Sequence, residues 1–273
     1  MKKVCQPEAV SSVISSWFSW SYIDRDFAGD FAGLQNGKSL ERNGDFPVIW
    51  DTKQKYVLKV AAPSGKVFAF KKYDHLKNAY KFFFRCSPCG AEAVNFQRIS
   101  SLDIPMPKLL AAGDIRRNFV LKSAFIATEF AEDFRDGRDF YGKGKLAADQ
   151  LLRDEFIKRN MELLARCHDN NILHRGFTPA NLLYRQRSAP DSNGNMLNLM
   201  WIDVASCRKV IRFYLKRAFI IDFEQFFRFF DFSDQELAKF IGCYLQAAEK
   251  PLASAPAIVK KLRAALEKRR RRK

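Results

Sequence analysis

The stretch ILHRGFTPANLLY, residues 172–184, decides how this chain is interpreted. It places His174, Arg175 and Asn181 in a short polar segment that runs into an apolar, strand-like end. Apolar residues at helical spacing precede it, and Asn170 with Asn171 are good residues to stop that helix. The polar segment is therefore predicted as a loop between a helix and a strand.

A second hairpin is expected directly after this loop. The runs LLYRQ (182–186) and LNLMWIDVA (197–205) flank APDSNGN, which is a strong turn sequence. Antiparallel pairing of the two runs would bring Asn181 and Asp203 to the same end of the hairpin. Both side chains offer hard oxygen atoms, which Mg²⁺ prefers as ligands.

The order His174, Arg175, Asn181, Asp203 matches a phosphotransferase pattern, in which H-R-D-x-x-x-x-N is followed by a metal-binding Asp. The position of the catalytic Asp is occupied by Gly176, and Thr178 stands where a Lys is often found. Glycine has no side chain and cannot accept the proton of an acceptor hydroxyl. General-base catalysis contributes roughly 10²- to 10⁴-fold, so turnover is expected to be weakened or lost.

Upstream, KYVLKVAAPSGKVFAFKKY (55–73) is predicted as a hairpin around the turn residues 62–65. Within its second strand, Ala69-x-Lys71 resembles the V-A-I-K strand whose Lys reaches the phosphates of ATP. Taken alone, the pattern favours an ordinary edge-strand lysine at position 71. Lys72 is a rival, but alternation along a strand points it to the opposite face.

Glu92 falls near the start of a short amphipathic helix predicted from GAEAVNFQRIS (90–100). In a kinase such a Glu pairs with the strand Lys, whereas the alternative is a Glu that merely suits the helix dipole. Two further β-like runs in 119–130 end at Glu129 and Phe130, where backbone groups would bind adenine. Lys71, Glu92 and the loop residues together, each on its expected element, favour the kinase interpretation.

Three further segments bear on this interpretation. GLQNGKS (33–39) has three residues between its glycines, where a phosphate-binding P-loop needs four, and no strand leads into it. DTKQKY (51–56) occupies the turn of the first strand pair, where a nucleotide-binding kinase carries glycines. Cys86 and Cys89 have C-x-x-C spacing, but no second such pair accompanies them, so reduced thiols are expected.

The segments FRCSPCGAEAVNFQRISSLDIPMPKLLAAGD (84–114) and FYLKRAFIIDFEQFF (213–227) resemble motifs of the lipopolysaccharide core kinases. This family, the Kdo and heptose kinases, is a branch of the protein-kinase-like superfamily, and the resemblance covers roughly residues 46–245. It implies an α+β, bilobal fold with a small β-rich N-lobe and a mainly helical C-lobe. The implied division is an N-terminal extension (1–45), the N-lobe (46–130), the C-lobe (131–250) and a basic C-terminal tail (251–273).

The resemblance also implies ATP and Mg²⁺ as cofactors, with a sugar of a lipid-linked core oligosaccharide as acceptor. His174, Asn181 and Asp203 would be catalytic, and Asn181 with Asp203 would hold the metal. Nucleotide binding would fall to Lys71, Glu92, Ala69, Glu129 and Phe130. The short link after Asp203 has no room for the activation segment that holds a peptide, which favours a sugar acceptor.

Charge and hydropathy restrict the partners. The 273 residues carry 47 Lys and Arg against 30 Asp and Glu, a formal net charge of +17, which calls for an anionic partner. No apolar run is long enough to span a bilayer. We expect a cytoplasmic, peripheral protein on the anionic inner face of a bacterial inner membrane, with the basic tail on the headgroups.

Nucleic acid is not expected as a partner, because no stacking module or DNA-reading motif is found. Two alternatives to an active kinase stay open. One is a catalytically silent pseudokinase that binds nucleotide and acts as a scaffold at the membrane. The other is a basic protein that uses the fold to bind anionic lipid or nucleic acid.

Overall fold

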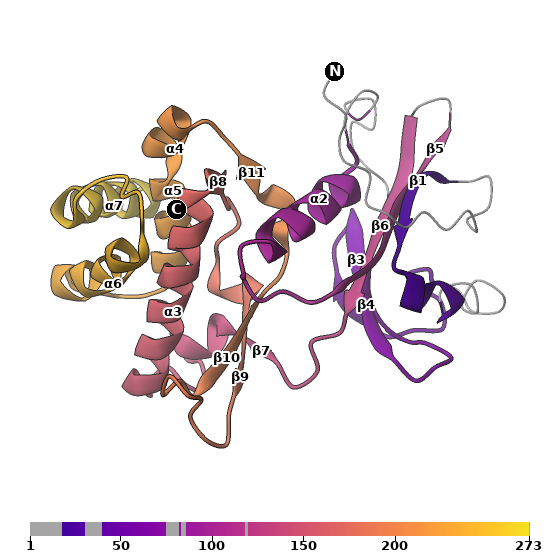
Figure 1. The fold of residues 1–273 in the computed structure, drawn as a ribbon, viewed down its shortest axis with the longest axis horizontal. Coiled ribbons are helices and arrows are strands. Elements are labelled where there is room, and N and C mark those ends of the chain that lie inside the picture. Colours follow the sequence, from indigo (N-terminus) through magenta and orange to yellow (C-terminus); the bar gives the residue numbers. More distant parts are fainter. Residues whose placement is uncertain (1–17, 31–39, 75–81, 83–85, 118–119, 273) are drawn as a thin grey trace. The chain divides into compact units, whose positions relative to one another are not determined.

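The structure, a computed structural model, describes residues 18–30, 40–74, 82, 86–117 and 120–272. The segment 33–39 and Cys5 lie outside these residues. The chain divides into two compact units (Figure 1). Unit 1 comprises residues 1–96 and 107–132, and unit 2 comprises residues 97–106 and 133–273.

Unit 1 is a six-stranded antiparallel sheet with the strand order β1-β5-β6-β4-β3-β2. The strands are β1 (Phe18–Ile23), β2 (Val48–Asp51), β3 (Lys55–Ala61), β4 (Val67–Tyr73), β5 (Leu109–Arg117) and β6 (Val120–Glu129). Alternate residues of β3 and β4, such as Leu58 and Phe68, are buried against Phe27 of the short helix η1 (Arg25–Phe27). Helix α2 (Pro88–Ser100) belongs to this unit as far as Phe96, and its last residues belong to unit 2.

The predicted hairpin between β3 and β4 is present. Its turn is closed by two hydrogen bonds, from the Ala62 amide to the Lys66 carbonyl and from the Gly65 amide to the Ala62 carbonyl. Gly65 has a φ of +85°, a conformation that glycine adopts without steric cost. This turn fixes the register that pairs Lys71 with Val57 on the neighbouring strand.

Unit 2 is mainly helical, which agrees with the predicted α+β class. Its α-helices are α3 (Gln150–Asp169), α4 (Arg212–Ala218), α5 (Ile220–Phe227), α6 (Asp234–Ala247) and α7 (Ala255–Arg270). Its short strands and turns of 3₁₀ helix are β7 (Arg135–Asp136), η3 (Gly137–Phe140), β8 (Ile172–Leu173), η4 (Pro179–Asn181), β9 (Leu182–Gln186), β10 (Leu197–Trp201), η5 (Val204–Ser206) and β11 (Arg208–Lys209).

Phenylalanine fills the core of unit 2. The rings of Phe156 and Phe177 both stack on Phe226, with centroid distances of 6.4 and 5.3 Å. Phe223 and Phe227 continue the cluster toward α6. Offset and edge contacts of this kind add about 0.5–1.5 kcal/mol per pair beyond burial. The abundance of Phe in the sequence is thus largely a packing feature.

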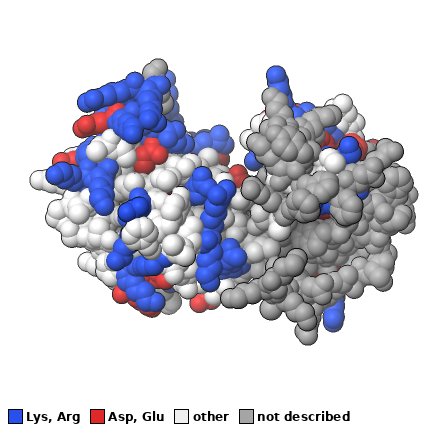
Figure 2. All heavy atoms as spheres, turned by 90° about the horizontal axis from the view of Figure 1, so that it is seen from above, with Lys and Arg blue, Asp and Glu red and all other residues white. Residues whose placement is uncertain are grey.

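The basic segment 251–273 contains helix α7, which packs on the rest of unit 2 through the buried Ile258 and Leu262. Arg269 pairs with Glu224 of α5 at 2.9 Å, so part of the segment's charge is used inside the unit. The face of unit 2 seen in Figure 2 shows many Lys and Arg side chains separated by uncharged surface. No helix among the described residues is long and apolar enough to cross a membrane.

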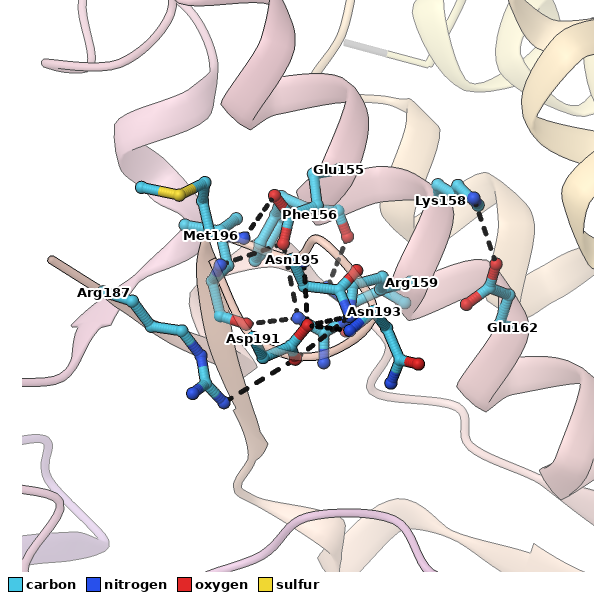
Figure 3. A network of polar contacts seen from close by, with 12 residues as sticks. Glu155, Phe156, Lys158, Arg159, Glu162, Arg187, Asp191, Asn193, Asn195 and Met196 are labelled. Atoms are coloured by element: carbon cyan, nitrogen blue, oxygen red, sulfur yellow. Dashed lines mark hydrogen bonds and ion pairs between the residues drawn. The ribbon is translucent and has the colours of Figure 1, made fainter. Parts of the chain in front are cut away.

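The β9–β10 hairpin is fastened to α3 by polar contacts (Figure 3). Glu155 of α3 accepts hydrogen bonds from the amides of Met196 and Leu197, at 3.0 and 2.9 Å. In the turn itself, Asp191 accepts hydrogen bonds from the amides of Asn193 and Asn195, both at 2.9 Å. These contacts hold the turn end of the hairpin against α3, and at the end where Asn181 and Asp203 lie, Trp201 Nε1 donates to Asn160 Oδ1 of α3 at 2.8 Å.

Candidate active site

The loop that begins at His174 is held in place by the buried carboxylate of Asp222. Asp222 of α5 accepts a hydrogen bond from the His174 amide at 2.8 Å and another from the Arg175 amide at 2.6 Å. It also contacts His168 Nε2 at 3.2 Å, and His168 Nδ1 lies 2.9 Å from the Tyr244 hydroxyl. Asp222 is fully buried, so these contacts replace its lost hydration.

Arg175 has a φ of +59°, which is uncommon for a residue with a side chain. The two hydrogen bonds to Asp222 compensate for this strained backbone by fixing the two amides that lead into the bend. Strained backbone that is held in this way is frequent at functional sites.

His174 itself is completely buried, with ring edges toward Phe177 and Trp201. Burial lowers the pKa of its imidazole below the usual 6.5, against the opposing influence of Asp222 and Asp203. Its Nδ1 accepts a hydrogen bond from the Gly176 amide at 3.2 Å, while Nε2 has no partner among the described residues. The neutral ring therefore shapes the loop and exposes no atom to solvent.

Gly176 lies where a kinase has its catalytic Asp. Its carbonyl accepts hydrogen bonds from the Thr178 amide at 2.8 Å and from Asn181 Nδ2 at 2.9 Å. A Cβ built on Gly176 would meet the nearest atoms, in His174 and Ser206, at 3.6–3.7 Å, which is ordinary van der Waals contact. The loop thus keeps the backbone form that a side chain at this position requires.

Asn181 and Asp203 lie at the same end of the β9–β10 hairpin. Leu182 pairs with Trp201, and the Ile202 amide donates to the Asn181 carbonyl at 2.9 Å. Because Asn181 Nδ2 is committed to Gly176, its Oδ1 is the atom left to bind a cation. Asp203, half-buried with a φ of +54°, follows β10 and supplies a carboxylate at this same end of the hairpin.

In unit 1, Lys71 of β4 and Glu92 of α2 form a buried ion pair. Lys71 Nζ lies 2.9 Å from one carboxylate oxygen of Glu92 and 3.0 Å from the other. Lys72 points elsewhere and pairs with Glu41. Ala69 lies two residues before Lys71 on the same face of β4, opposite Thr128 of β6.

Glu129 ends β6 and Phe130 follows it, and both of their amides are already used within unit 1. The Glu129 amide donates to the Lys108 carbonyl at 2.9 Å, and the Phe130 amide donates to the Val67 carbonyl at 3.2 Å. A purine edge would therefore find acceptors at these residues, or donors in the residues that follow.

The turn between β2 and β3 has no free cradle of amides. The Thr52 hydroxyl accepts hydrogen bonds from the amides of Gln54 and Lys55, and the Thr52 amide donates to the Lys55 carbonyl. Phosphate groups would have to be held by side chains instead, Lys71 among them.

The two thiols of the C-x-x-C segment differ in environment. Cys86 is exposed and Cys89 is buried, and the structure has both as free thiols. Burial raises the pKa of Cys89 well above its usual range, with the Glu92 carboxylate adding to the effect. A buried neutral thiol of this kind is a packing residue.

Sequence reasoning missed Asp222, which holds the loop, and His168, which contacts Asp222. The signal was an acidic residue in the middle of AFIIDFEQFF (218–227), where helical spacing puts it among buried Phe positions. A lone carboxylate on an apolar helix face must have hydrogen-bond donors nearby, because an unpaired buried charge is costly.

A protein-family model and a solved structure both match this chain. The model of the lipopolysaccharide kinase (Kdo/WaaP) family matches residues 70–244, more than half of the chain. A solved structure described as WaaP in complex with acyl carrier protein is 15% identical with a TM-score of 0.59. It covers 82% of this chain, and 88% of the WaaP chain is covered.

This structural likeness confirms the protein-kinase-like fold expected from the sequence. No curated protein matches the sequence. The match to the family model spans Lys71, Glu92, the loop from His174 to Asn181, and Asp203. The chain belongs to the lipopolysaccharide kinase (Kdo/WaaP) family.

Proposed function

We propose that the chain transfers the γ-phosphate of ATP, with Mg²⁺, to a sugar hydroxyl of a lipid-linked lipopolysaccharide core. The observation that carries this proposal is the Lys71–Glu92 ion pair, whose side chains are only 12% and 3% exposed. Burying such a pair rarely improves stability over apolar residues of similar size. Its presence is better explained by a lysine held in place to meet phosphate groups.

The roles of the other residues follow from their surroundings. Glu92 would orient Lys71, and Ala69 with the carbonyls at Glu129 and Phe130 would border the adenine. His174 would act by position, because its buried ring supports the loop without reaching an acceptor. Asp222 would keep the amides of His174 and Arg175 fixed throughout turnover.

The donor set at the hairpin end fits Mg²⁺. Asn181 Oδ1 and the Asp203 carboxylate are two hard oxygen ligands, and Mg²⁺ commonly takes one or two carboxylates while phosphates and water complete its shell. No cluster of three or more His, Cys, Asp or Glu side chains suited to a metal occurs in the described part of the chain. When bound, the ion would neutralise charge on the phosphates.

The acceptor hydroxyl would have no carboxylate base at position 176. The expected loss of roughly 10²- to 10⁴-fold corresponds to about 3–5.5 kcal/mol of activation free energy. Positioning and charge stabilisation supply most of the catalysis of phosphoryl transfer, so slow turnover is expected. A silent pseudokinase is the second candidate, and Gly176 is the observation that favours it.

The decisive experiment compares transfer of labelled phosphate to core acceptors by the wild type, Gly176→Asp and Gly176→Asn. Both side chains have the same size, and the surroundings of Gly176 accept a Cβ. Only the Asp can take a proton, so we expect Gly176→Asp alone to gain about 10²-fold or more. Asp203→Asn provides the background.

Wild-type transfer no higher than that of Asp203→Asn would select the pseudokinase, provided that ATP with Mg²⁺ still raises the melting temperature. An absence of any nucleotide effect in the wild type and in Gly176→Asp would reject both candidates. For an active enzyme, we propose the acceptor at the inner face of a bacterial inner membrane, where a basic protein meets anionic lipid.

A further inference from the structure

The segment after Asp203 carries an unusual surface. In residues 204–221 there are five Lys or Arg residues and no Asp or Glu. The same segment holds half of the exposed large apolar side chains found in the described residues, namely Ile211, Phe213, Tyr214 and Ile221. Single exposed apolar residues are normal, but a cluster rimmed by charge marks an interaction site.

The burial pattern shows which side chains anchor α4 to unit 2 and which are exposed. Leu215 and Ala218 of α4 are buried and anchor the helix to unit 2. Ile211, Phe213 and Tyr214 are 72%, 61% and 51% exposed. Helix α4 is therefore packed on the unit through Leu215 and Ala218, while Phe213, Tyr214 and the preceding Ile211 lie in solvent.

The charges frame this apolar face. Arg208, Lys209, Lys216 and Arg217 are exposed. The Arg217 guanidinium lies 4.2 Å from the centre of the Phe213 ring. Helix α4 lies at the top of unit 2 in Figure 1, and Figure 2 looks onto that side, where basic side chains alternate with uncharged surface.

The surface is rigidly connected to the candidate active site. Arg212 Nη1 donates to the carbonyl of His168 at 2.7 Å, and His168 contacts Asp222, which holds the His174 loop. Strand β11 pairs with β8, so Arg208 lies opposite Leu173, the residue before His174. Whatever binds α4 is thus fixed relative to the loop.

We propose that the surface formed by β11 and α4, called here the α4 surface, docks on an anionic lipid bilayer. Ile211, Phe213 and Tyr214 enter the headgroup region while the flanking Lys and Arg contact acidic headgroups. An apolar face with aromatic side chains and a basic rim is the pattern of interfacial segments. Charge complementarity selects an anionic membrane over a neutral one.

This inference rests on the proposed function in one respect only: docking would bring a lipid-anchored acceptor to the loop after β8. Docking itself is independent of ATP, of Mg²⁺ and of transfer. Binding and activity are therefore measured separately, so that each can fail alone.

The test is sedimentation of the full chain with phosphatidylcholine vesicles, with and without phosphatidylglycerol. We expect binding that requires phosphatidylglycerol and weakens as salt is raised. Lys216→Glu with Arg217→Glu is expected to reduce the affinity at least about 25-fold, roughly fivefold for each basic residue. Phe213→Ser with Tyr214→Ser is expected to reduce it at least about tenfold.

Matched controls change the same chemistry elsewhere in unit 2. Lys260→Glu with Lys261→Glu reverses two exposed charges on α7, and Leu151→Ser removes an exposed apolar side chain at the start of α3. These controls are expected to bind within about threefold of the wild type, because their charges lie outside the contact and are screened by salt.

Hydrogen exchange of the wild type gives a second measurement that does not depend on any variant folding. With phosphatidylglycerol vesicles, amides in 208–221 are expected to exchange more slowly, while those of α6 keep their rates. Absence of vesicle binding, equal losses in α4 and control variants, or protection elsewhere would overturn the proposal. So would binding of nucleic acid through the same residues without vesicle binding. Lost binding with unchanged transfer to a deacylated soluble acceptor would support it.

Discussion

Each of the two units holds its own candidate functional residues in place with a buried carboxylate, but the two carboxylates have different partners. In unit 1, Glu92 pairs with the side chain of Lys71. In unit 2, Asp222 accepts hydrogen bonds from the main-chain amides of His174 and Arg175. The first arrangement joins two replaceable side chains, whereas the second joins a side chain to backbone that every variant retains.

This difference separates functional from structural demands. A side-chain ion pair can be exchanged for two apolar residues without leaving a charge behind, so its retention points to function. Backbone amides cannot be removed, so the loop needs Asp222 whether or not phosphate is transferred. An intact Asp222 framework around Gly176 is therefore compatible with an inactive protein, while an intact Lys71–Glu92 pair favours nucleotide binding.

The largest effect is expected for Asp222→Asn. The amide that replaces the carboxylate turns one acceptor into a donor that faces buried N–H groups, so the free energy of unfolding should fall by about 3–5 kcal/mol. Urea denaturation of the full chain measures it.

Asp169→Asn is the matched control, because the half-buried Asp169 also accepts two main-chain hydrogen bonds, from the exposed Glu249 and Lys250. Water can replace a lost partner there, and we expect a loss of about 1 kcal/mol or less. Equal losses for the two variants would show that burial of Asp222 is not what makes it important.

A smaller loss of stability is expected for Lys71→Met, about 2–3 kcal/mol, because Glu92 then keeps a buried charge without its cation. Lys71→Met combined with Glu92→Leu should recover most of this loss while abolishing the stabilisation by ATP. Melting temperatures with and without ATP and Mg²⁺ measure both effects.

Lys72→Met is the control on the same strand, since Lys72 pairs with the exposed Glu41 and such pairs contribute roughly 0–1 kcal/mol. It should keep the ATP effect. If the double variant is as unstable as Lys71→Met, the pair is structural, and the comparison between the two units loses its basis.

The candidate functional side chains of both units could be predicted from the sequence. Lys71 and Glu92 follow from strand alternation and helical spacing, and Asn181 with Asp203 follow from a hairpin whose turn residues are evident. These are local patterns, which a sequence displays directly.

The contacts of Asp222 were not predicted, because they join residues almost fifty positions apart and involve amides, which have no identity in a sequence. The same reason hides the amides of Glu129 and Phe130, whose partners depend on sheet order. Strand β1 was also missed. It lies within the expected extension of residues 1–45, and it forms a strand only because β5 offers it an edge.

The smallest expected effect sharpens the view of His174 as a residue that shapes the loop. Burial lowers the pKa of its imidazole below 6.5, so the ring is neutral in the folded protein, while in the unfolded chain it titrates near 6.5. As the pH falls below 6.5, the unfolded chain binds a proton that the folded chain does not, and the free energy of unfolding falls. At higher pH this contribution is fully present.

In His174→Phe the ring still packs between Phe177 and Trp201, and the hydrogen bond from the Gly176 amide is lost at every pH. That loss lowers stability by a constant amount, so only the slope below pH 6.5 reports the titration. We expect urea denaturation between pH 7.5 and 5.5, roughly one unit to either side of the titration, to give a smaller slope for the variant. Asp222, Asp203 and His168 face the ring in both proteins, so the two proteins differ only in the ring itself. Parallel curves would mean that His174 takes up a proton in the folded state, and a charged imidazole beside Asp222 would then be part of what holds the loop.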